Sequence, residues 1–362
     1  MISAAYYQTI YLIIITLLTL GVYAQYQCRN GLREFKHSHT DALGIFWTLS
    51  FILFIGLRPI SSVFIDMTQY WGLYQRYGGE SFIFSWGTEN LIYDNLMYYF
   101  VSIKFPPKLF YLIIAAIYFG AAYLGIRKLF PNHRLTAYLV FLAAFSTFSY
   151  GTNGIKAGAA TSLFILAMGY RENLKICIPL VLLSWGFHHS MIMVVAGFVL
   201  TLFVKKPKYY FIGWCFCLLM AAAHITAFQQ LFSGVTTEHG ANYLLTEGGN
   251  EGTKGGFRID FILYSAMPVL VGWYAVFKKK MRLSPLYKDL LNLYLCLNGV
   301  WMLCMYANFT NRIAYLSWFL YPIVLIYPFL QEQWGKARYK TFGLVMLGHL
   351  GFTLFMEFII YG

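Results

Sequence analysis

Four basic residues and a histidine pair stand at the edges of apolar stretches, where polar side chains need a reason. The basic residues are Arg58, Lys156, Arg258 and Arg312, and the histidines are His188 and His189. Guanidinium and ammonium groups bind phosphate oxygens and stabilise the charge that develops on a pyrophosphate leaving group. Imidazole titrates near neutral pH and can accept the proton of an attacking hydroxyl. Together these types suit group transfer from an amphiphile with an anionic head, such as a lipid-linked pyrophosphate.

The local sequences around two of the cations support this interpretation. Lys156 lies in Gly151-Thr152-Asn153-Gly154-Ile155-Lys156-Ala157-Gly158, where glycines permit a tight turn and a helix start leaves amides free for an anion. Arg58 ends an apolar stretch before Pro59, and Asp66 and Tyr70 follow it. The alternative in both places is a snorkelling side chain at a turn or beside a loop carboxylate.

The histidines and the two later arginines also have plain alternatives. A histidine pair could ligate zinc, but no carboxylate or thiol stands at ligand spacing, so we expect no metal. A hydrogen-bonded interfacial histidine is the alternative to proton transfer. Arg258, with Asp260, and Arg312 each open an apolar stretch, and each alone is an ordinary helix-end residue. The case for a site is their joint placement near membrane boundaries.

A membrane-embedded chain must position these groups. Hydrophobic residues make up 59% of the 362 positions and charged residues 11%, whereas a soluble domain carries about a quarter charged residues. A span needs about 20 residues. We predict an all-α polytopic integral membrane protein, a single membrane domain over 1–362 with about 12 transmembrane helices. The apolar stretches are 4–24, 41–57, 109–126, 135–150, 157–170, 176–187, 190–204, 209–229, 259–277, 289–307, 313–330 and 341–361.

The basic residues fix the predicted orientation. Of the 27 lysines and arginines, 19 lie in six alternate loops if 176–204 forms two passes rather than one. The positive-inside rule then puts those loops in the cytoplasm and both termini, with the candidate site, outside. Because the basic residues are scattered between apolar stretches, we expect no nucleic-acid partner.

The hairpins and outer segments carry further predictions. The stretches between 135 and 204 are short, so the tips with Lys156 and His188-His189 should be recessed. The outer segment 58–108 contains an aromatic-rich part that should be interfacial or re-entrant. The outer segment 230–258 is glycine-rich and suits a lid over a site.

Several of these motifs resemble the EpsG-like branch of Wzy-type polysaccharide polymerases. They occur in order as Gly56-Leu57-Arg58-Pro59 with Asp66 and Tyr70, the Gly-x-Lys-x-Gly-Ala stretch, His188-His189-Ser190 and Asn311-Arg312-x-x-Tyr315. The similarity covers roughly 40–330. It implies a GT-C-like, metal-independent glycosyltransferase without a cofactor. One departure is Lys156, where the family's third motif usually carries arginine, so bidentate phosphate contact is lost.

The resemblance also implies a reaction and a place. Such polymerases join undecaprenyl-pyrophosphate-linked oligosaccharides on the periplasmic face of the bacterial inner membrane, for O-antigen, capsule or exopolysaccharide. The growing glycan is transferred from one lipid carrier to the non-reducing end of the next unit. Expected partners are the lipid-linked donor and acceptor, membrane lipid, and, as candidates, a chain-length regulator and a flippase.

The residues receive roles on this basis. We expect pyrophosphate binding by Arg58, Lys156, Arg312 and Arg258, and contacts to acceptor or sugar by Tyr70, Asn153 and Tyr315. His189 or His188 should act as the base, and Asp66 should orient the acceptor or share that role. Two rival functions are a flippase for lipid-linked oligosaccharides and a membrane O-acyltransferase. One-sided polar groups and the lack of an internal repeat argue against the first, and outward histidines argue against the second.

Overall fold

The fold is helical throughout the part of the chain that the structure describes, and no strand occurs there. This computed structural model describes residues 2–28, 37–77, 79, 81–233, 242, 244–246, 256–335 and 338–360. The prediction of an all-α protein is confirmed, and helices lie along each of the twelve predicted apolar stretches. Most of the glycine-rich part of 230–258 lies outside the described residues.

The chain divides into two compact units. Unit 1 is Met1–Met191 together with Ala337–Gly362, and unit 2 is Ile192–Lys336. Unit 1 is therefore discontinuous in sequence, since the last helix joins the first half of the chain. The prediction of one membrane domain over 1–362 stays a prediction.

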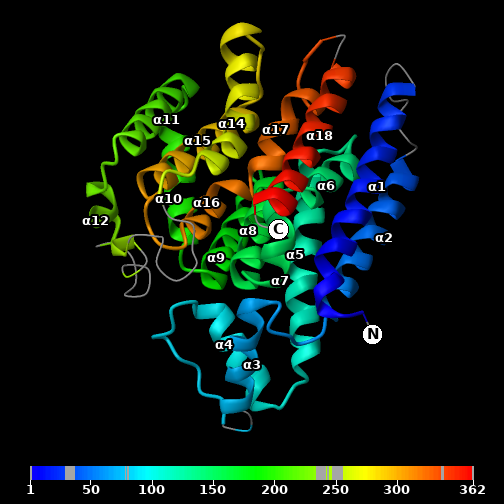
Figure 1. The fold of residues 1–362 in the computed structure, drawn as a ribbon, viewed down its shortest axis with the longest axis vertical. Helices are drawn as coiled ribbons and strands as arrows, with labels where there is room; N and C mark the ends of the chain where they lie inside the picture. Colours follow the sequence, from blue (N-terminus) through cyan, green and yellow to red (C-terminus); the bar gives the residue numbers. More distant parts are fainter. Residues whose placement is uncertain are drawn as a thin grey trace. The chain divides into compact units, whose positions relative to one another are not determined.

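Unit 1 contains long helices and several short ones (Figure 1). Their bounds are η1 (Ala4–Tyr6), α1 (Tyr7–Cys28), α2 (His37–Gly56), α3 (Ile65–Tyr77), α4 (Leu91–Ser102), α5 (Pro107–Leu129), α6 (Arg134–Leu142), α7 (Phe145–Thr152), α8 (Ile155–Gly169), α9 (Leu174–Phe187), α18 (Arg338–Phe355) and η3 (Met356–Ile360).

Unit 2 contains the remaining described helices. Their bounds are α10 (Met191–Phe203), α11 (Pro207–Ala222), α12 (Ala227–Ser233), α14 (Ile259–Trp273), η2 (Tyr274–Lys278), α15 (Pro285–Leu303), α16 (Thr310–Trp318) and α17 (Tyr321–Leu330). Helix α15 shows why such boundaries fall where they do: Ser284 caps it by accepting from Tyr287 N at 3.2 Å, and Pro285 follows at the first helical position.

Helix α5 is the central helix of unit 1 and packs along α8 and α2 (Figure 1). Gly125 permits the close approach of α8, because a Cβ there would lie 2.7 Å from Leu166 N and 2.8 Å from Ile165 O. Small residues at helix contacts allow backbones in membranes to approach and gain packing energy. The α5–α8 pair thus depends on the absence of a side chain at one position.

The predicted stretch 135–150 is not one straight helix, because α6 and α7 meet at a bend of 73°. The carbonyls that the break frees are bonded by side chains from α1 and α18. These bonds join Tyr11 Oη to Leu142 O (2.6 Å), His349 Nε2 to Val140 O (3.0 Å) and Thr353 Oγ1 to Ala143 O (2.8 Å). Backbone carbonyls in an apolar environment need such partners, so the break is stabilised from neighbouring helices.

Helices α3 and α4 lie together at one end of unit 1 (Figure 1). Both lie within the predicted outer segment 58–108, and residues 81–90 precede α4 without regular structure. Asn95 fixes this connection, since it donates to Ser85 O at 2.8 Å and accepts from Ser85 N at 2.8 Å. The start of α4 is therefore held in place, which matters for the site below.

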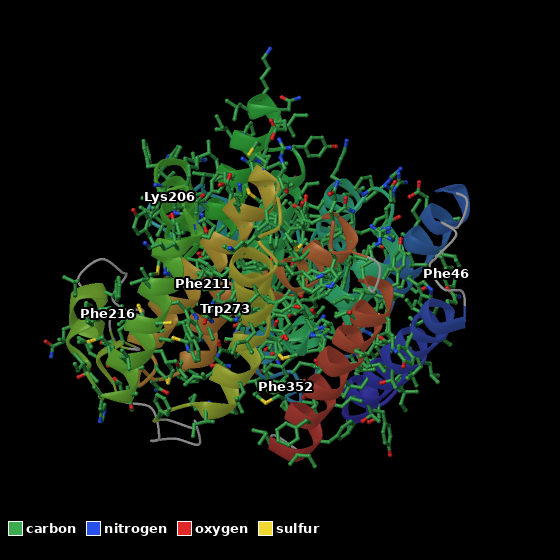
Figure 2. All side chains as sticks on the ribbon, turned by 90° about the horizontal axis from the view of Figure 1, so that it is seen from above. Phe46, Lys206, Phe211, Phe216, Trp273 and Phe352 are labelled. Carbon is green, nitrogen blue, oxygen red and sulfur yellow. The ribbon has the colours of Figure 1, made fainter. Side chains whose placement is uncertain are left out.

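Five helical segments among the described residues are long and apolar enough to cross a membrane, or six if α6 and α7 count as one span. Others, such as α8 and α9, are apolar but shorter. Large apolar side chains face outward from both units, and Figure 2 marks Phe46, Phe216 and Trp273 among them. The protein is membrane-embedded, and the full count of twelve spans stays a prediction.

Replacing Gly125 with alanine tests the α5–α8 contact. The new Cβ meets backbone atoms that cannot move aside, so we expect a loss of about 1–3 kcal/mol of stability and a clearly lower unfolding midpoint in detergent. Gly120→Ala is the matched control on the same helix, because nothing lies within 4 Å of its Cβ position. Equal midpoints for the two variants would contradict the proposed close packing.

Candidate functional site

The start of α4 is linked to Lys156 through a carboxylate. Asp94 Oδ2 accepts from the backbone N of Asn90 at 3.0 Å and from its Nδ2 at 3.3 Å. Asp94 Oδ1 lies 3.7 Å from Lys156 Nζ, with both side chains largely buried. Lys156 Nζ also lies over the Tyr93 ring, 5.5 Å from its centroid. The ammonium group is thus paired and placed beside an aromatic face.

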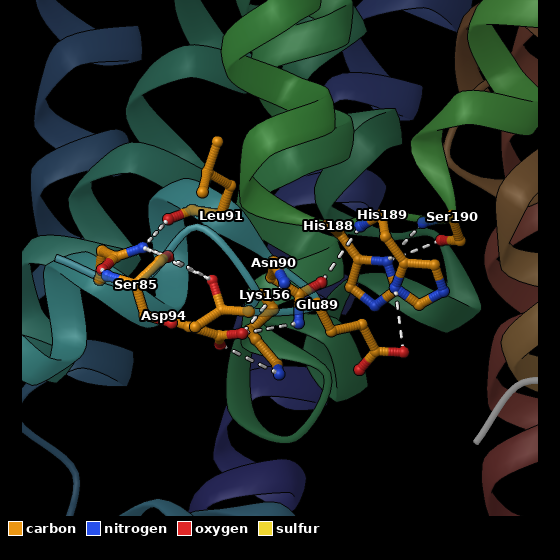
Figure 3. Close-up of polar contacts among 11 residues, drawn as sticks. Ser85, Glu89, Asn90, Leu91, Asp94, Lys156, His188, His189 and Ser190 are labelled. Atoms are coloured by element: carbon orange, nitrogen blue, oxygen red, sulfur yellow. Dashed lines mark hydrogen bonds and ion pairs between the residues drawn. The ribbon is translucent and has the colours of Figure 1, made fainter. Parts of the chain in front are cut away.

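The same segment holds the histidine turn (Figure 3). Asn90, 2% exposed, accepts with Oδ1 from the backbone N of His189 at 3.1 Å. Asparagine at a helix start usually accepts from its own helix, but here the side chain makes no such bond. Its side-chain oxygen instead accepts a hydrogen bond from a residue 99 positions away in the sequence. Asn90 therefore connects the histidine turn to the carboxylate that holds Lys156.

The two histidine rings have different partners. His189 Nδ1 lies 3.5 Å from Glu89 Oε1. His188 Nδ1 accepts from Ser190 N at 3.3 Å and lies 2.7 Å from Ser190 Oγ. The rings are stacked, with centroids 5.2 Å apart and planes inclined by 18°. Figure 3 shows the Glu89 carboxylate and the Ser190 hydroxyl reaching different rings.

Charges and burial act in opposite directions on His189. Burial lowers the pKa of His189 below its ordinary value, and Lys156 lowers it further. Glu89 and Asp94 raise that pKa, without cancelling the effect of burial. The imidazole is therefore neutral at neutral pH, which is the form that can accept a proton.

Arg58 is buried and bonded to two helix ends. It is 1% exposed, and its Nη1 and Nη2 donate to Ile55 O at 2.8 Å and Thr152 O at 2.7 Å. Its guanidinium also lies 5.4 Å from the ring centroids of Phe64 and Tyr111. A cation at helix C-termini satisfies the last carbonyls and the helix dipole. In this structure Arg58 joins the end of α2 to the end of α7.

The turn between α7 and α8 comes directly after Thr152, whose carbonyl Arg58 bonds. Asn153 ends α7, and its backbone N donates to Ser149 O at 2.7 Å. Gly158 lets α7 and α8 close together, since a Cβ there would lie 2.4 Å from Tyr150 O. Lys156 stands in the first turn of α8 as a consequence. The glycine motif in the sequence therefore serves a tight turn that aims Lys156 toward α4.

Asp66 and Tyr70 lie one turn apart on α3. The Tyr70 ring is 6.1 Å from the Tyr93 ring, which adjoins Lys156. Both α3 residues are half-buried. They are thus on the element that packs against α4, and Tyr70 reaches the neighbourhood of the cation.

In unit 2, Arg258 is already engaged by a carboxylate. Its Nε donates to Asp260 Oδ1 at 2.9 Å, a second contact joins Nη2 to Asp260 Oδ2, and the guanidinium stacks 3.6 Å from the Phe261 ring centroid. Arg258 is 7% exposed. Its charge is largely compensated at the start of α14.

Arg312, also in unit 2, is exposed at the start of α16. Its guanidinium lies 4.9 Å from the Phe309 ring centroid, and Phe309 has the left-handed φ of 50°. Trp301 Nε1 donates to Thr310 Oγ1 at 3.0 Å and so fixes this helix start. Tyr315, one turn after Arg312, is buried. Of these two motif residues, Arg312 is the one that presents a charge to the surface.

The structure therefore links the predicted residues Lys156, His188 and His189 within unit 1. Asn153 lies in the turn before Lys156, and Arg58 bonds the end of α7 at Thr152 O. Arg258, Arg312 and Tyr315 belong to unit 2. The sequence prediction missed Glu89, Asn90 and Asp94, which link the two motifs. Their signal was the polar interruption Gly87-Thr88-Glu89-Asn90 just before an apolar stretch, with an acid one turn later.

Metal ligation has no support in the described part of the chain. No group of three or more histidine, cysteine, aspartate or glutamate side chains there could hold a metal ion. The predicted metal-independent chemistry stays a prediction.

Comparison with known proteins identifies a family. The model of the EpsG family matches residues 41–360, which is most of the chain. No curated protein and no solved structure matches the chain.

Replacing Arg58 with methionine tests its role as a link between helix ends. The variant keeps an unbranched apolar side chain but removes the side-chain donors to Ile55 O and Thr152 O, and bonds to charged groups contribute about 1.5–3 kcal/mol each. We expect a markedly lower unfolding midpoint in detergent, with partial recovery in Arg58→Lys. Arg76→Met, at an exposed position on α3, is the control. A normal midpoint for Arg58→Met would contradict the structural role.

Proposed function

The chain belongs to the EpsG family, whose members are polysaccharide polymerase-like, and from this premise we propose that it is a glycosyltransferase. It polymerises undecaprenyl-pyrophosphate-linked oligosaccharide repeat units. The growing glycan passes from one lipid carrier to the non-reducing end of the next unit, as in the assembly of O-antigen, capsule or exopolysaccharide. The protein works without metal or cofactor on a GT-C-like membrane scaffold.

One observation supports this proposal most directly. The short segment 89–94 contacts both a largely buried ammonium group and an imidazole. Asn90 bonds the His189 backbone and also Asp94, which pairs with Lys156. Pyrophosphate transfer needs a cation for the leaving group and a base for the incoming hydroxyl. Lys156 and His189 supply these two roles from one rigid framework.

The reaction follows from these roles. A hydroxyl oxygen of the acceptor unit attacks the anomeric carbon of the donor glycan, and the bond from that carbon to the phosphate oxygen breaks. Undecaprenyl pyrophosphate leaves with the electron pair, and the histidine takes the hydroxyl proton. Lys156 offsets the charge on the leaving group, which costs less where the cation is already in place.

The other predicted residues take supporting roles in this proposal. Arg312 presents an exposed guanidinium for pyrophosphate, whereas Arg258 is compensated by Asp260 and contributes less. Arg58 positions the turn before Lys156 through its hydrogen bond to Thr152 O. Asp66 orients the acceptor or shares the base role. The acceptor or its sugar is contacted by Tyr70, Asn153 and Tyr315.

The proposed location is the bacterial inner membrane, with the site facing the periplasm. The distribution of 19 of the 27 basic residues in six alternate loops supports this orientation. Lipid-linked donor and acceptor would then reach the site from the outer leaflet, with a flippase and a chain-length regulator as candidate partners.

The direct test uses purified protein in detergent with its native undecaprenyl-pyrophosphate-linked repeat unit and a metal chelator. Products are resolved on a gel. A ladder of glycan lengths supports a metal-independent polymerase. The absence of a ladder, together with transbilayer movement of the same unit in vesicles, would instead indicate a flippase.

Variants of the proposed site give a sharper expectation. His189→Ala should lower the rate of polymer formation by about 10²- to 10⁴-fold, the usual contribution of a general base. Arg312→Ala and Lys156→Ala should lower it by about 10²- to 10³-fold, and Lys156→Arg should retain most of it. Arg76→Ala serves as the matched surface control. Normal ladders from the histidine and arginine variants, at equal protein levels, would refute the site assignment.

A further inference from the structure

The groups next to the Nδ1 atoms of the two adjacent histidines favour opposite tautomers. His188 Nδ1 accepts from Ser190 N at 3.3 Å, so this nitrogen carries a lone pair and Nε2 carries the hydrogen in the neutral ring. His189 Nδ1 faces the Glu89 carboxylate at 3.5 Å. This contact is an ion-pair contact without hydrogen-bond geometry, but the negative charge favours the tautomer with the hydrogen on Nδ1 and the lone pair on Nε2.

Neutral imidazole has one donor and one acceptor nitrogen, and the partner of one nitrogen fixes the function of the other. His188 can therefore offer a substrate only an N–H from Nε2. His189 can offer a lone pair from Nε2. The adjacent side chains thus differ in chemistry although their sequence gives no reason to distinguish them.

We propose that Glu89 is the positioning residue that makes His189, and not His188, the base, with His188 acting as a hydrogen-bond donor to the acceptor sugar. This inference rests on the proposed glycosyl transfer. His189 Nε2 takes the hydroxyl proton as the new glycosidic bond forms. Glu89 stabilises the resulting imidazolium and receives no proton itself.

The placement of Glu89 makes this role specific. It directly precedes Asn90, whose Oδ1 fixes the backbone of His189. The carboxylate and the imidazole are both partly shielded, with side-chain exposures of 31% and 25%, so their attraction is only partly screened. Figure 3 shows both contacts coming from one stretch of backbone to one histidine.

Neighbouring charges also bear on His189. Asp94 raises and Lys156 lowers its pKa, alongside the effect of Glu89. Of these three, Glu89 is the one in direct contact with the ring. Removing its charge should therefore change the protonation of His189 without touching the Lys156–Asp94 pair.

The first experiment reads the rings directly and needs no activity. Protein labelled with ¹⁵N-histidine in nanodiscs is titrated by NMR, with ring signals assigned through His188→Gln and His189→Gln. We expect the Nε2–H tautomer for His188 and the Nδ1–H tautomer for His189. Glu89→Gln should lower the pKa of His189, because the charge that raises it is removed, and should leave the His188 tautomer unchanged. Glu172→Gln, which removes an exposed acid elsewhere in unit 1, is the matched control.

The second experiment follows the initial rate of glycan transfer against pH. A base must be neutral to act, so the rate falls as pH drops through the pKa of His189. Since Glu89 raises that pKa, Glu89→Gln should move the acid limb to lower pH and lower the plateau rate about tenfold or more. Glu89→Asp should restore part of both.

The outcomes separate the two proposals. Identical His189 titrations in wild type and Glu89→Gln, or the same tautomer in both histidines, would overturn the inference whatever the enzyme does. A shifted titration in a protein that makes no polymer from its native repeat unit would support the Glu89–His189 coupling and refute the polymerase.

Discussion

The structure depends on the need to satisfy polar backbone groups inside an apolar protein. Lipid offers no hydrogen bonds, so any departure from a continuous helix must be bonded by the protein itself. Each irregularity described above follows this pattern. The bend between α6 and α7 has its freed carbonyls bonded by α1 and α18, and the ends of α2 and α7 share the guanidinium of Arg58. The candidate site lies next to one of these helix ends, since Lys156 begins α8 directly after the end of α7 that Arg58 bonds.

The role that the sequence predicts for Arg58 differs from the contacts that it makes in the structure. From the sequence, an arginine on the outer side of a membrane span suggested an anion ligand. In the structure its two terminal nitrogens bond backbone carbonyls, and the side chain is closed off from solvent. Loss of activity in an Arg58 variant would therefore report the position of the α7–α8 turn at least as much as a phosphate contact. Arg312, exposed on α16, is the better measure of a direct role.

The sequence predicted the helices well because long apolar stretches permit little else. It also predicted that Lys156 and the histidines would share a neighbourhood, from their common place near one membrane boundary. It could not predict Glu89, Asn90 and Asp94 as their partners, since Asn90 and His189 are 99 positions apart and no local pattern marks such a bond. The bend between α6 and α7 could not be predicted for a similar reason. Ala143 and Ala144 suit a helix, and the groups that stabilise the bend come from both ends of the chain.

The discontinuity of unit 1 has a consequence for biosynthesis. His349 and Thr353 are synthesised 209 and 210 residues after Val140 and Ala143, whose carbonyls they bond. Until α18 inserts, the bend that precedes the Lys156 turn lacks two of its donors. A nascent chain without α18 would thus have a less stabilised bend before the Lys156 turn. Helix α18 must therefore insert before the bend has all of its side-chain donors.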